Sequence, residues 1–352
     1  ASGLQWTFAP MVDVSRDPRW GRVMEGAGED AYLGSEIARA RVRGFQGDDL
    51  SANNTILACA KHFAGYGASE GGRDYNTVDI SDQRLREYYL PPFKAAIDEG
   101  VATFMNSFNE LGGNPATGNK LLVERILRGE WGWNGTIVSD WGSVGEMITH
   151  GIAEDAAQAT LLAIGNECDI DMESNCYIGS LEQLVKDGKV SEKEIDRSVR
   201  RILRLKFELG LFDDPYRYCD EGREAALILS ADHRSTARDM ARKSVVLLEN
   251  RESVLPLSPD VRSVAVIGPL ADSRKDMIAE WKARGEAGDA GTILMGIKNA
   301  VGPNTRVAYS KGCEVTGEDR SGFAAAVYAA RSADVVVMCL GESADMSSEG
   351  YC

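Results

Sequence analysis

The chain has 352 residues, of which 43% are hydrophobic and 26% are charged. This composition is typical of a globular protein of roughly two domains, and it argues against a disordered or fibrous chain. Its formal net charge is −15, with 54 acidic and 39 basic residues, so neither nucleic acid nor a membrane is expected as a partner.

Strands alternate with helices in the first half of the chain, which is typical of a parallel sheet. The predicted strands cover residues 7–14, 55–63, 101–107, 136–139 and 168–172, and the predicted helices cover residues 30–46, 81–99, 120–129, 153–164 and 192–209. These make about five strand–helix units, whereas a complete (β/α)8 TIM-like barrel needs roughly 250 residues. We therefore predict an α/β fold in which residues 1–216 form the C-terminal part of a (β/α)8 barrel that is incomplete at its N-terminus.

The character of the sequence changes after this region. A helix over 230–242 and a strand over 245–249 are predicted to precede a turn-rich joint at Pro256 and Pro259, and residues 217–260 are expected to be a linker with a docking helix. The remaining predicted elements are central strands over 264–268 and 334–341, a helix over 292–301 and an edge strand over 306–309. Residues 261–352 are therefore predicted to be the first part of an open α/β sandwich domain, incomplete at its C-terminus because its sheet would otherwise end on an exposed edge.

The seven cysteines contain no CxxC pair and no cluster with histidine, so we expect no metal site. Cys59 and Cys339 lie in apolar runs and are predicted to be buried thiols, while a bridge between Cys168 and Cys176 stays open. The Val-Ile-Gly-Pro-Leu-Ala-Asp segment (266–272) lacks the glycine patterns of phosphate-binding loops, which makes a nucleotide-binding enzyme a weak alternative. No cofactor is expected.

Side chains suited to chemistry follow the C-terminal ends of the predicted strands, where barrels of parallel strands place their active sites. They are Arg19 and Arg22 after the first strand, Lys61 and His62 after the second, residues 106–109 after the third, and Asp140 and Trp141 after the fourth. Cationic and amide groups keep a carboxylate ionised and donate to hydroxyl groups, and an indole face packs against a sugar ring. Each residue alone is more commonly a surface ion pair or a core residue, but their shared placement predicts a carbohydrate site centred on Asp140.

Longer motifs around these residues resemble, in order, those of glycoside hydrolase family 3. They are Arg-Asp-Pro-Arg-Trp-Gly-Arg (16–22), Lys-His-Phe (61–63), Ser-Asp-Trp (139–141), Gly-Leu-Phe-Asp-Asp-Pro-Tyr (210–216) and Leu-Leu-Glu-Asn (247–250). Two more, Gly-Gly-Arg-Asp-Tyr-Asn (71–76) and Gly-Pro-Leu-Ala-Asp (268–272), are similar to the family's periplasmic β-glucosidase branch. The resemblance implies an oligosaccharide or aryl β-glucoside substrate and a periplasmic or secreted location, and it leaves a homodimer open.

The resemblance also implies roles for individual residues. Asp140 matches the catalytic nucleophile, whereas Phe108 stands where many members carry a tyrosine. The matches to the sugar-binding subsite are Arg22, Lys61 and His62, the flanking Trp141, and, more weakly, Arg73 and Met105. The loop after Lys-His-Phe lacks the Asp-x-His pattern of the hexosaminidase branch, which argues against N-acetylglucosamine substrates.

A β-glycosidase that retains configuration needs a second carboxyl group, about 5 to 5.5 Å from the nucleophile, as the acid and base. The resemblance implies a glutamate on a loop of the second domain, and the loop after the last predicted strand carries Glu342 and Glu349. Glu349 is our choice, and Glu146, which could approach from the barrel, is the rival. All three could also be solvated surface residues.

The sequence thus predicts a retaining, exo-acting β-glucosidase, with a β-xylosidase of the same family as the nearest enzymatic alternative. A non-catalytic carbohydrate-binding fragment is the alternative from another class, because a fold does not fix a function. The position of the acid separates the two classes, since sugar binding without turnover is favoured if no glutamate can approach Asp140.

Overall fold

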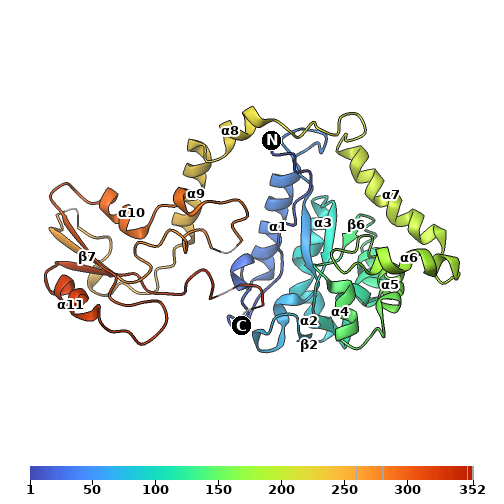
Figure 1. Cartoon of the computed structure of the whole chain (residues 1–352), viewed down its shortest axis with the longest axis horizontal. Helices are drawn as coiled ribbons and strands as arrows, with labels where there is room; N and C mark the ends of the chain where they lie inside the picture. Colours follow the sequence, from blue (N-terminus) through green and yellow to red (C-terminus); the bar gives the residue numbers. More distant parts are fainter. Residues whose placement is uncertain (259, 280, 347, 351–352) are drawn as a thin grey trace. The chain divides into compact units, whose positions relative to one another are not determined.

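The computed structural model describes residues 1–258, 260–279, 281–346 and 348–350. Contacts within the chain divide it into two compact units (Figure 1). The first comprises Ala1–Arg234 together with the C-terminal residues from Glu349, and the second comprises Ser235–Ser348. The predicted joint residue Pro259 lies outside the described residues.

A parallel sheet forms the centre of the first unit. Its strands are β1 (Cys59–Phe63), β3 (Thr103–Asn106) and β6 (Thr136–Val138), in the order β1-β3-β6. Parallel bridges from Trp6 to Leu57 and from Met11 to Lys61 place the N-terminal segment beside β1, and a bridge from Val138 to Ile170 places residue 170 beside β6. Five neighbouring segments thus run in parallel, and the predicted strands at 7–14 and 168–172 contribute isolated bridges rather than regular strands.

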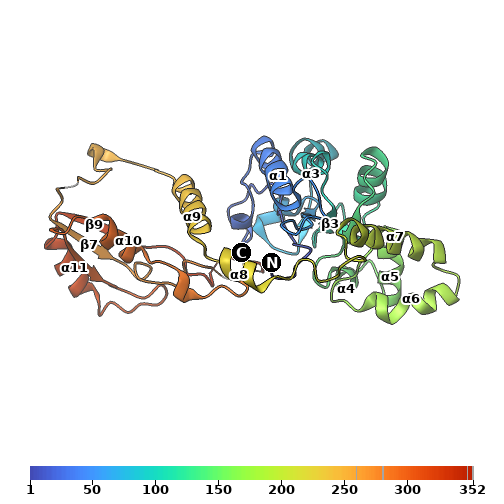
Figure 2. The ribbon, with the colours of Figure 1, turned by 90° about the horizontal axis from the view of Figure 1, so that it is seen from above.

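Helices connect and cover these strands. They are α1 (Ala31–Gln46), α2 (Asp82–Arg84), the π-helix η4 (Leu85–Tyr89), α3 (Pro91–Asp98), the π-helix η6 (Leu121–Glu130), α4 (Ser143–Thr149), α5 (Ala156–Gly165), α6 (Cys176–Lys186), α7 (Glu192–Glu208) and α8 (Glu221–Leu227). In both views α1 lies beside α3, and α5 lies beside α6 (Figure 1, Figure 2). The single helix predicted over 81–99 is wrong, because Pro91 has no N–H for the preceding turn and a new helix begins there.

Short elements fill the loops of the first unit. They are the 3₁₀ turns η1 (Val23–Glu25), η2 (Tyr66–Ala68), η3 (Glu70–Gly72) and η5 (Ala116–Gly118), and the strands β2 (Thr77–Val78), β4 (Glu110–Leu111) and β5 (Asn114–Pro115), which form a small separate sheet.

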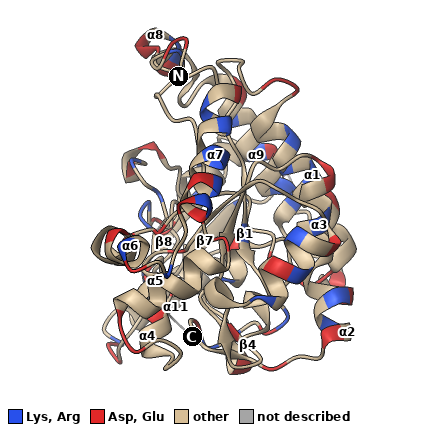
Figure 3. Ribbon diagram, turned by 90° about the vertical axis from the view of Figure 1, so that its right-hand side faces the viewer, with Lys and Arg blue, Asp and Glu red and all other residues tan. Residues whose placement is uncertain are grey.

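Local sequence signals account for the ends of the two longest helices. The Asp30 side chain accepts a hydrogen bond from the backbone N–H of Leu33, which caps α1 where an acceptor is needed. Ser191 and Glu194 form a reciprocal capping box at the start of α7. Figure 3 shows that α7 carries both basic and acidic side chains; Glu192 and Glu194 are in its first turn and Lys206 is in its last turn.

Aromatic packing beneath the sheet consolidates the first unit. The Phe63 ring makes edge-to-face contacts with Phe93 at 5.2 Å and with Phe104 at 5.3 Å between ring centroids. All three rings are fully buried. Buried apolar surface and favourable edge-to-face geometry therefore stabilise the packing of β1 and β3 against α3. This packing fixes the strand ends that carry the polar residues described below.

The second unit contains a three-stranded parallel sheet in the order β8-β7-β9. Its elements are α9 (Ala231–Ser244, which begins at the end of the first unit), η7 (Arg251–Ser253), β7 (Ser263–Ile267), η8 (Ala287–Asp289), α10 (Ile293–Ala300), β8 (Arg306–Ser310), α11 (Phe323–Arg331) and β9 (Val335–Met338). The predicted central position of β7 is confirmed, because it pairs on both sides and Val264–Ile267 are buried.

Two predictions for the second unit are wrong. Residues 334–341 contain β9, which lies at an edge of the described sheet. Val336 and Met338, which share one face of this strand, are 40% and 55% exposed. Residues 245–249 form no strand, and Leu248 is 92% exposed. A β-prone sequence becomes a strand only where a partner supplies hydrogen bonds and a packing surface, and no described segment pairs with it.

The predicted thiols Cys59 and Cys339 are both buried and free, as expected. Cys168 and Cys176 are also buried free thiols and form no bridge with each other. Among the residues that the structure describes, no helix combines the length and apolar composition needed to cross a bilayer.

Candidate active site

Three buried side chains from separate segments meet at the C-terminal ends of the parallel strands. Asp140 follows β6, His62 lies in β1, and Arg22 precedes the short turn η1. The His62 Nε2 atom lies 3.3 Å from Asp140 Oδ2 and 3.0 Å from Arg22 Nη2. The sheet therefore brings together residues that are far apart in the sequence.

His62 is held from its other side by Asp13, a residue that the sequence analysis did not select. One carboxylate oxygen, Asp13 Oδ2, lies 2.8 Å from His62 Nδ1 and accepts the His62 backbone N–H at 3.0 Å. Burial lowers the pKa of His62 well below its ordinary value, so the ring is neutral with its proton on Nδ1. The lone pair of Nε2 then accepts from Arg22.

Arg22 links this pair to two further carboxylates. Its Nε and Nη2 atoms donate to the two carboxylate oxygens of Glu25 at 2.7 and 3.0 Å, and its Nη1 lies 3.3 Å from Glu349 Oε1. Burial opposes the charge, but the Glu25 and Glu349 carboxylates outweigh it and raise the pKa of Arg22. The guanidinium is therefore a fixed positive charge beside Asp140.

The two oxygens of Asp140 have different surroundings. Oδ1 accepts the Trp141 backbone N–H at 2.7 Å, whereas Oδ2 is buried and receives no hydrogen bond from the described residues. Burial raises the pKa of Asp140 to about 6, against the lowering effects of the Trp141 N–H, Lys61 and Arg22. A buried acceptor without a donor is rare in native proteins, so Oδ2 is the atom available to a ligand.

A second buried polar group lies at the end of β3. Asn106 is 1% exposed, and neither polar atom of its side-chain amide makes a hydrogen bond with the described residues. Since β3 lies between β1 and β6, this amide ends the strand between those that carry His62 and Asp140. Unsatisfied donors and acceptors at this edge of the sheet suit a polar ligand better than an apolar one.

Two glutamates contribute to the charge around Asp140. The Oε1 atom of Glu349, which belongs to the first unit, accepts from the Tyr75 hydroxyl at 2.7 Å. Glu146 lies in α4, and burial, followed by the charges of Asp140 and Glu349, raises its pKa to about 7. The charge of Glu349 raises the pKa of both Asp140 and Glu146, so all three carboxyl groups are near enough to interact electrostatically. Glu342, in contrast, is an exposed residue of the second unit.

The other predicted site residues have less direct positions. Lys61 is half-buried and lowers the pKa of Asp140 through its charge. Trp141 touches Asp140 through its backbone, and its indole is 63% exposed. Met105 is buried in an apolar cluster with Cys59, while Arg73 is exposed.

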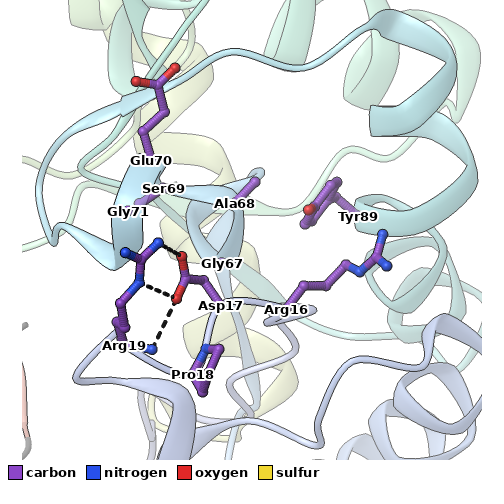
Figure 4. Close-up of a pocket in the computed structure, with 10 residues that line it drawn as sticks. All are labelled: Arg16, Asp17, Pro18, Arg19, Gly67, Ala68, Ser69, Glu70, Gly71 and Tyr89. Carbon is purple, nitrogen blue, oxygen red and sulfur yellow. Dashed lines mark hydrogen bonds and ion pairs between the residues drawn. The ribbon is translucent and has the colours of Figure 1, made fainter.

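Arg19 lines a separate cleft of about 610 Å³. Figure 4 shows its guanidinium pointing at Asp17, to which it donates at 2.9 and 2.7 Å. Glu70 and Tyr89 line the same cleft, whereas Asp140 and His62 do not. The Arg-Asp-Pro-Arg-Trp-Gly-Arg motif thus directs Arg19 outward and Arg22 to the cluster.

Several residues of the cluster were missed by reasoning from the sequence. Asp13 had a detectable signal, since it is the one charged residue in an otherwise apolar run, Met-Val-Asp-Val (11–14). Glu25 follows the first arginine motif closely, and Tyr75 lies in one of the motifs that carry the family resemblance. Their contacts depend on how distant loops fold together, so nothing in the local pattern assigned them a partner.

Comparisons with known proteins place these features in a family. Residues 1–205 match the glycosyl hydrolase family 3 N terminal domain, and residues 245–351 match the family's C-terminal domain. The chain is 43% identical to a periplasmic beta-glucosidase of Salmonella typhimurium, over 99% of this chain and 48% of that protein. It is 35% identical to a beta-xylosidase of Formosa agariphila, over 99% of this chain and 50% of that protein.

Solved structures give the same result. A beta-glucosidase from Listeria innocua in complex with isofagomine matches with a TM-score of 0.94 at 41% identity, covering 99% of this chain and 48% of that one. A GH3 exo-beta-xylosidase in complex with a xylobiose aziridine probe matches with a TM-score of 0.87 at 32% identity, covering 98% and 45%. The chain spans about half the length of the relatives that it matches.

Proposed function

This chain belongs to glycosyl hydrolase family 3, and from that membership we propose that it acts as a retaining, exo-acting β-glucosidase. The substrates are terminal, non-reducing β-D-glucosyl residues of oligosaccharides or aryl β-glucosides. The observation that carries this proposal is the buried Asp140 carboxylate, whose Oδ2 has no donor among the described residues and whose surroundings include Arg22, His62 and a second carboxyl group.

Asp140 is the nucleophile in the proposed reaction. Oδ1 is fixed by the Trp141 N–H, and Oδ2 attacks the anomeric carbon as the bond to the leaving oxygen breaks. Glu349 donates a proton to that oxygen, then takes a proton from the water that attacks the anomeric carbon and releases the Asp140 carboxylate. Two inversions at one carbon give net retention.

Glu349 is preferred to Glu146 as the acid and base because its carboxylate accepts from the Tyr75 hydroxyl at 2.7 Å and forms an ion pair with Arg22 at 3.3 Å. Arg22 also contacts His62, which touches Asp140. Glu146 remains the rival, since a pKa raised to about 7 suits a proton donor near neutral pH. The presence of two glutamates near Asp140 favours turnover over a non-catalytic carbohydrate-binding role.

Sugar recognition is proposed to use donors that surround the nucleophile. Arg22, Lys61 and His62 would hold hydroxyl groups, and the exposed indole of Trp141 would pack against a ring at the rim. Arg73 and Met105 are weaker candidates.

A β-xylosidase is the second candidate function, because a beta-xylosidase is among the relatives of similar coverage. Pentosides lack the hydroxymethyl group of glucosides, so the ratio of kcat/KM on a β-glucoside and on a β-xyloside distinguishes the two functions.

Further proposals concern the rest of the molecule. The five neighbouring parallel segments support the proposal that residues 1–216 are part of a (β/α)8 barrel. Residues 217–260 are proposed to be a linker with a docking helix, and residues 261–352 to be the first part of an α/β sandwich domain. A periplasmic location is supported by the relative from Salmonella typhimurium. A homodimer is the assembly that we would test first.

The test of the function uses a 2,4-dinitrophenyl β-glucoside with the unmodified protein and with Asp140→Ala. We expect turnover to be lost in Asp140→Ala and restored by azide, with α-glucosyl azide as product, because azide replaces the missing carboxylate on the opposite face of the sugar. Asp17→Ala is the matched control, since Asp17 pairs with Arg19 in the separate cleft. An unmodified protein that binds glucosides without turnover would instead support the non-catalytic alternative.

A further inference from the structure

Two consecutive residues, Asp74 and Tyr75, hold the segment that carries Glu349. The Tyr75 hydroxyl donates to Glu349 Oε1 at 2.7 Å, and Asp74 Oδ2 accepts the backbone N–H of Gly350 at 2.8 Å. Glu349 and Gly350 belong to the first unit, as Asp74 and Tyr75 do. One hydrogen bond thus fixes the glutamate side chain, and the other fixes the backbone next to it.

The two holding residues are themselves fixed by buried side chains. Asp74 Oδ1 accepts from Trp20 Nε1 at 2.8 Å, and Trp20 is 1% exposed. The Tyr75 ring packs edge to face on the buried Phe108, with 4.5 Å between ring centroids. Neither residue can turn away from Glu349 without breaking a contact to the core of the first unit.

The backbone of Tyr75 is strained. Its φ angle is 59°, in the left-handed region that non-glycine residues rarely adopt. Such a conformation costs on the order of 1 kcal/mol and persists where the surroundings determine it, which is common at functional sites. Here the strain accompanies a side chain directed at the proposed acid.

The contacts of Glu349 Oε1 decide which of the two carboxyl oxygens carries the proton when Glu349 is protonated. The Tyr75 hydroxyl donates to this oxygen, and the Arg22 guanidinium forms an ion pair with it, with Nη1 3.3 Å away. Burial, followed by the bond to Glu349, raises the pKa of Tyr75 above its ordinary value, so the phenol stays a donor over the working pH range. A proton that Glu349 transfers to a leaving group is therefore directed to the other oxygen, Oε2.

We propose that Asp74 and Tyr75 are positioning residues that hold Glu349 for proton transfer, with Tyr75 selecting the carboxyl oxygen that carries the proton. This inference rests on the proposed role of Glu349 as the acid and base. Asp74 and Tyr75 would thus affect the rate of proton transfer from Glu349 and not the binding of the sugar.

The test is the dependence of kcat/KM on the leaving group. Phenol needs protonation to leave, whereas 2,4-dinitrophenol leaves as an anion, so a defect in acid positioning affects phenyl β-glucoside selectively. We expect Tyr75→Phe, which keeps the ring on Phe108, to lose about tenfold in kcat/KM on the phenyl substrate and less than about twofold on the dinitrophenyl substrate, as for one charge-assisted hydrogen bond. Tyr32→Phe, at a position that is 76% exposed, is the matched control and should change neither value.

Asp74→Asn provides a second variant, since an amide has one carbonyl oxygen for the two donors that Asp74 accepts. It should show the same selectivity for the phenyl substrate, with the thermal unfolding midpoint reporting any general loss of structure. Equal losses on both substrates would show a merely structural role, and unchanged kinetics in Tyr75→Phe would also overturn the inference.

Glu349→Gln separates the failure of this inference from the failure of the proposed acid. If Glu349→Gln is selective for phenyl β-glucoside and Tyr75→Phe is not, the positioning role alone is wrong. If Glu349→Gln has no effect on the phenyl substrate while Glu146→Gln does, the acid assignment is wrong and the positioning role falls with it.

Discussion

Asp13 offers a quantitative test of how burial acts in this cluster. The substitution Asp13→Asn removes the charge but can keep both hydrogen bonds, because both of them fall on a single oxygen, Oδ2. Burial raises the pKa of Asp13 from its ordinary 3.8 to about 7, against the lowering effects of the His62 N–H and Arg22. The variant therefore isolates the cost of ionising this carboxyl group in the folded protein.

The direction in which the stability changes with pH follows from proton binding at Asp13. Between the unfolded pKa of 3.8 and the folded pKa of about 7, the folded state binds more protons at Asp13 than the unfolded state does. The stability that this group contributes is fully present below pH 3.8 and is lost as the pH rises to about 7. A shift of roughly three pKa units corresponds to about 4 kcal/mol, as an order of magnitude.

The assay is urea unfolding of the unmodified protein and of Asp13→Asn at pH 4 and pH 8. We expect the free energy of unfolding of the unmodified protein, relative to the variant, to fall by about 4 kcal/mol from the lower to the higher pH. Asp17→Asn is the control. Arg19 lowers the pKa of the half-buried Asp17 to about 2, so its small difference should have the opposite sign.

A difference between the unmodified protein and Asp13→Asn that stays constant with pH, or that rises with pH, would refute the reasoning. Activity gives a second readout of the same substitution. Because the carbonyl oxygen that Asp13→Asn keeps can still accept from Nδ1, the His62 proton stays on Nδ1 and we expect kcat/KM to change by less than about twofold.

Two further predictions concern the second carboxyl group and the stability of the first unit. With azide, Glu349→Ala should yield β-glucosyl azide, detected by NMR, because azide replaces the water that Glu349 activates; product formation in Glu146→Ala instead would reverse the assignment. Arg201→Ala should lower the free energy of urea unfolding by about 3 kcal/mol, since it leaves the buried Asp169, 3.1 Å away, with less compensation, and Arg200→Ala, on the exposed face of α7, should cost less than about 0.5 kcal/mol. A similar loss in both arginine variants would contradict the buried-pair argument.

Much of the fold was predictable because its signals are local. Apolar runs placed β1, β3, β6 and β7 to within a few residues, and side chains such as Asp30 that accept backbone N–H groups marked where helices begin. The same patterns failed where a neighbour decides the outcome. Residues 245–249 have strand composition but pair with no described strand, and β9 lies at an edge of the described sheet rather than at its centre.

The sequence by itself determined which polar residues follow the strand ends, and therefore that Asp140, His62 and Arg22 could share one edge of a parallel sheet. Only the tertiary structure decided their partners. Asp13 meets His62 across 49 positions of sequence, and Tyr75 meets Glu349 across 274. Hydrophobic period and capping patterns extend over a few residues, whereas burial, charge and the direction of a hydrogen bond depend on which distant loops pack together, so the state of each carboxyl group is a property of the folded chain.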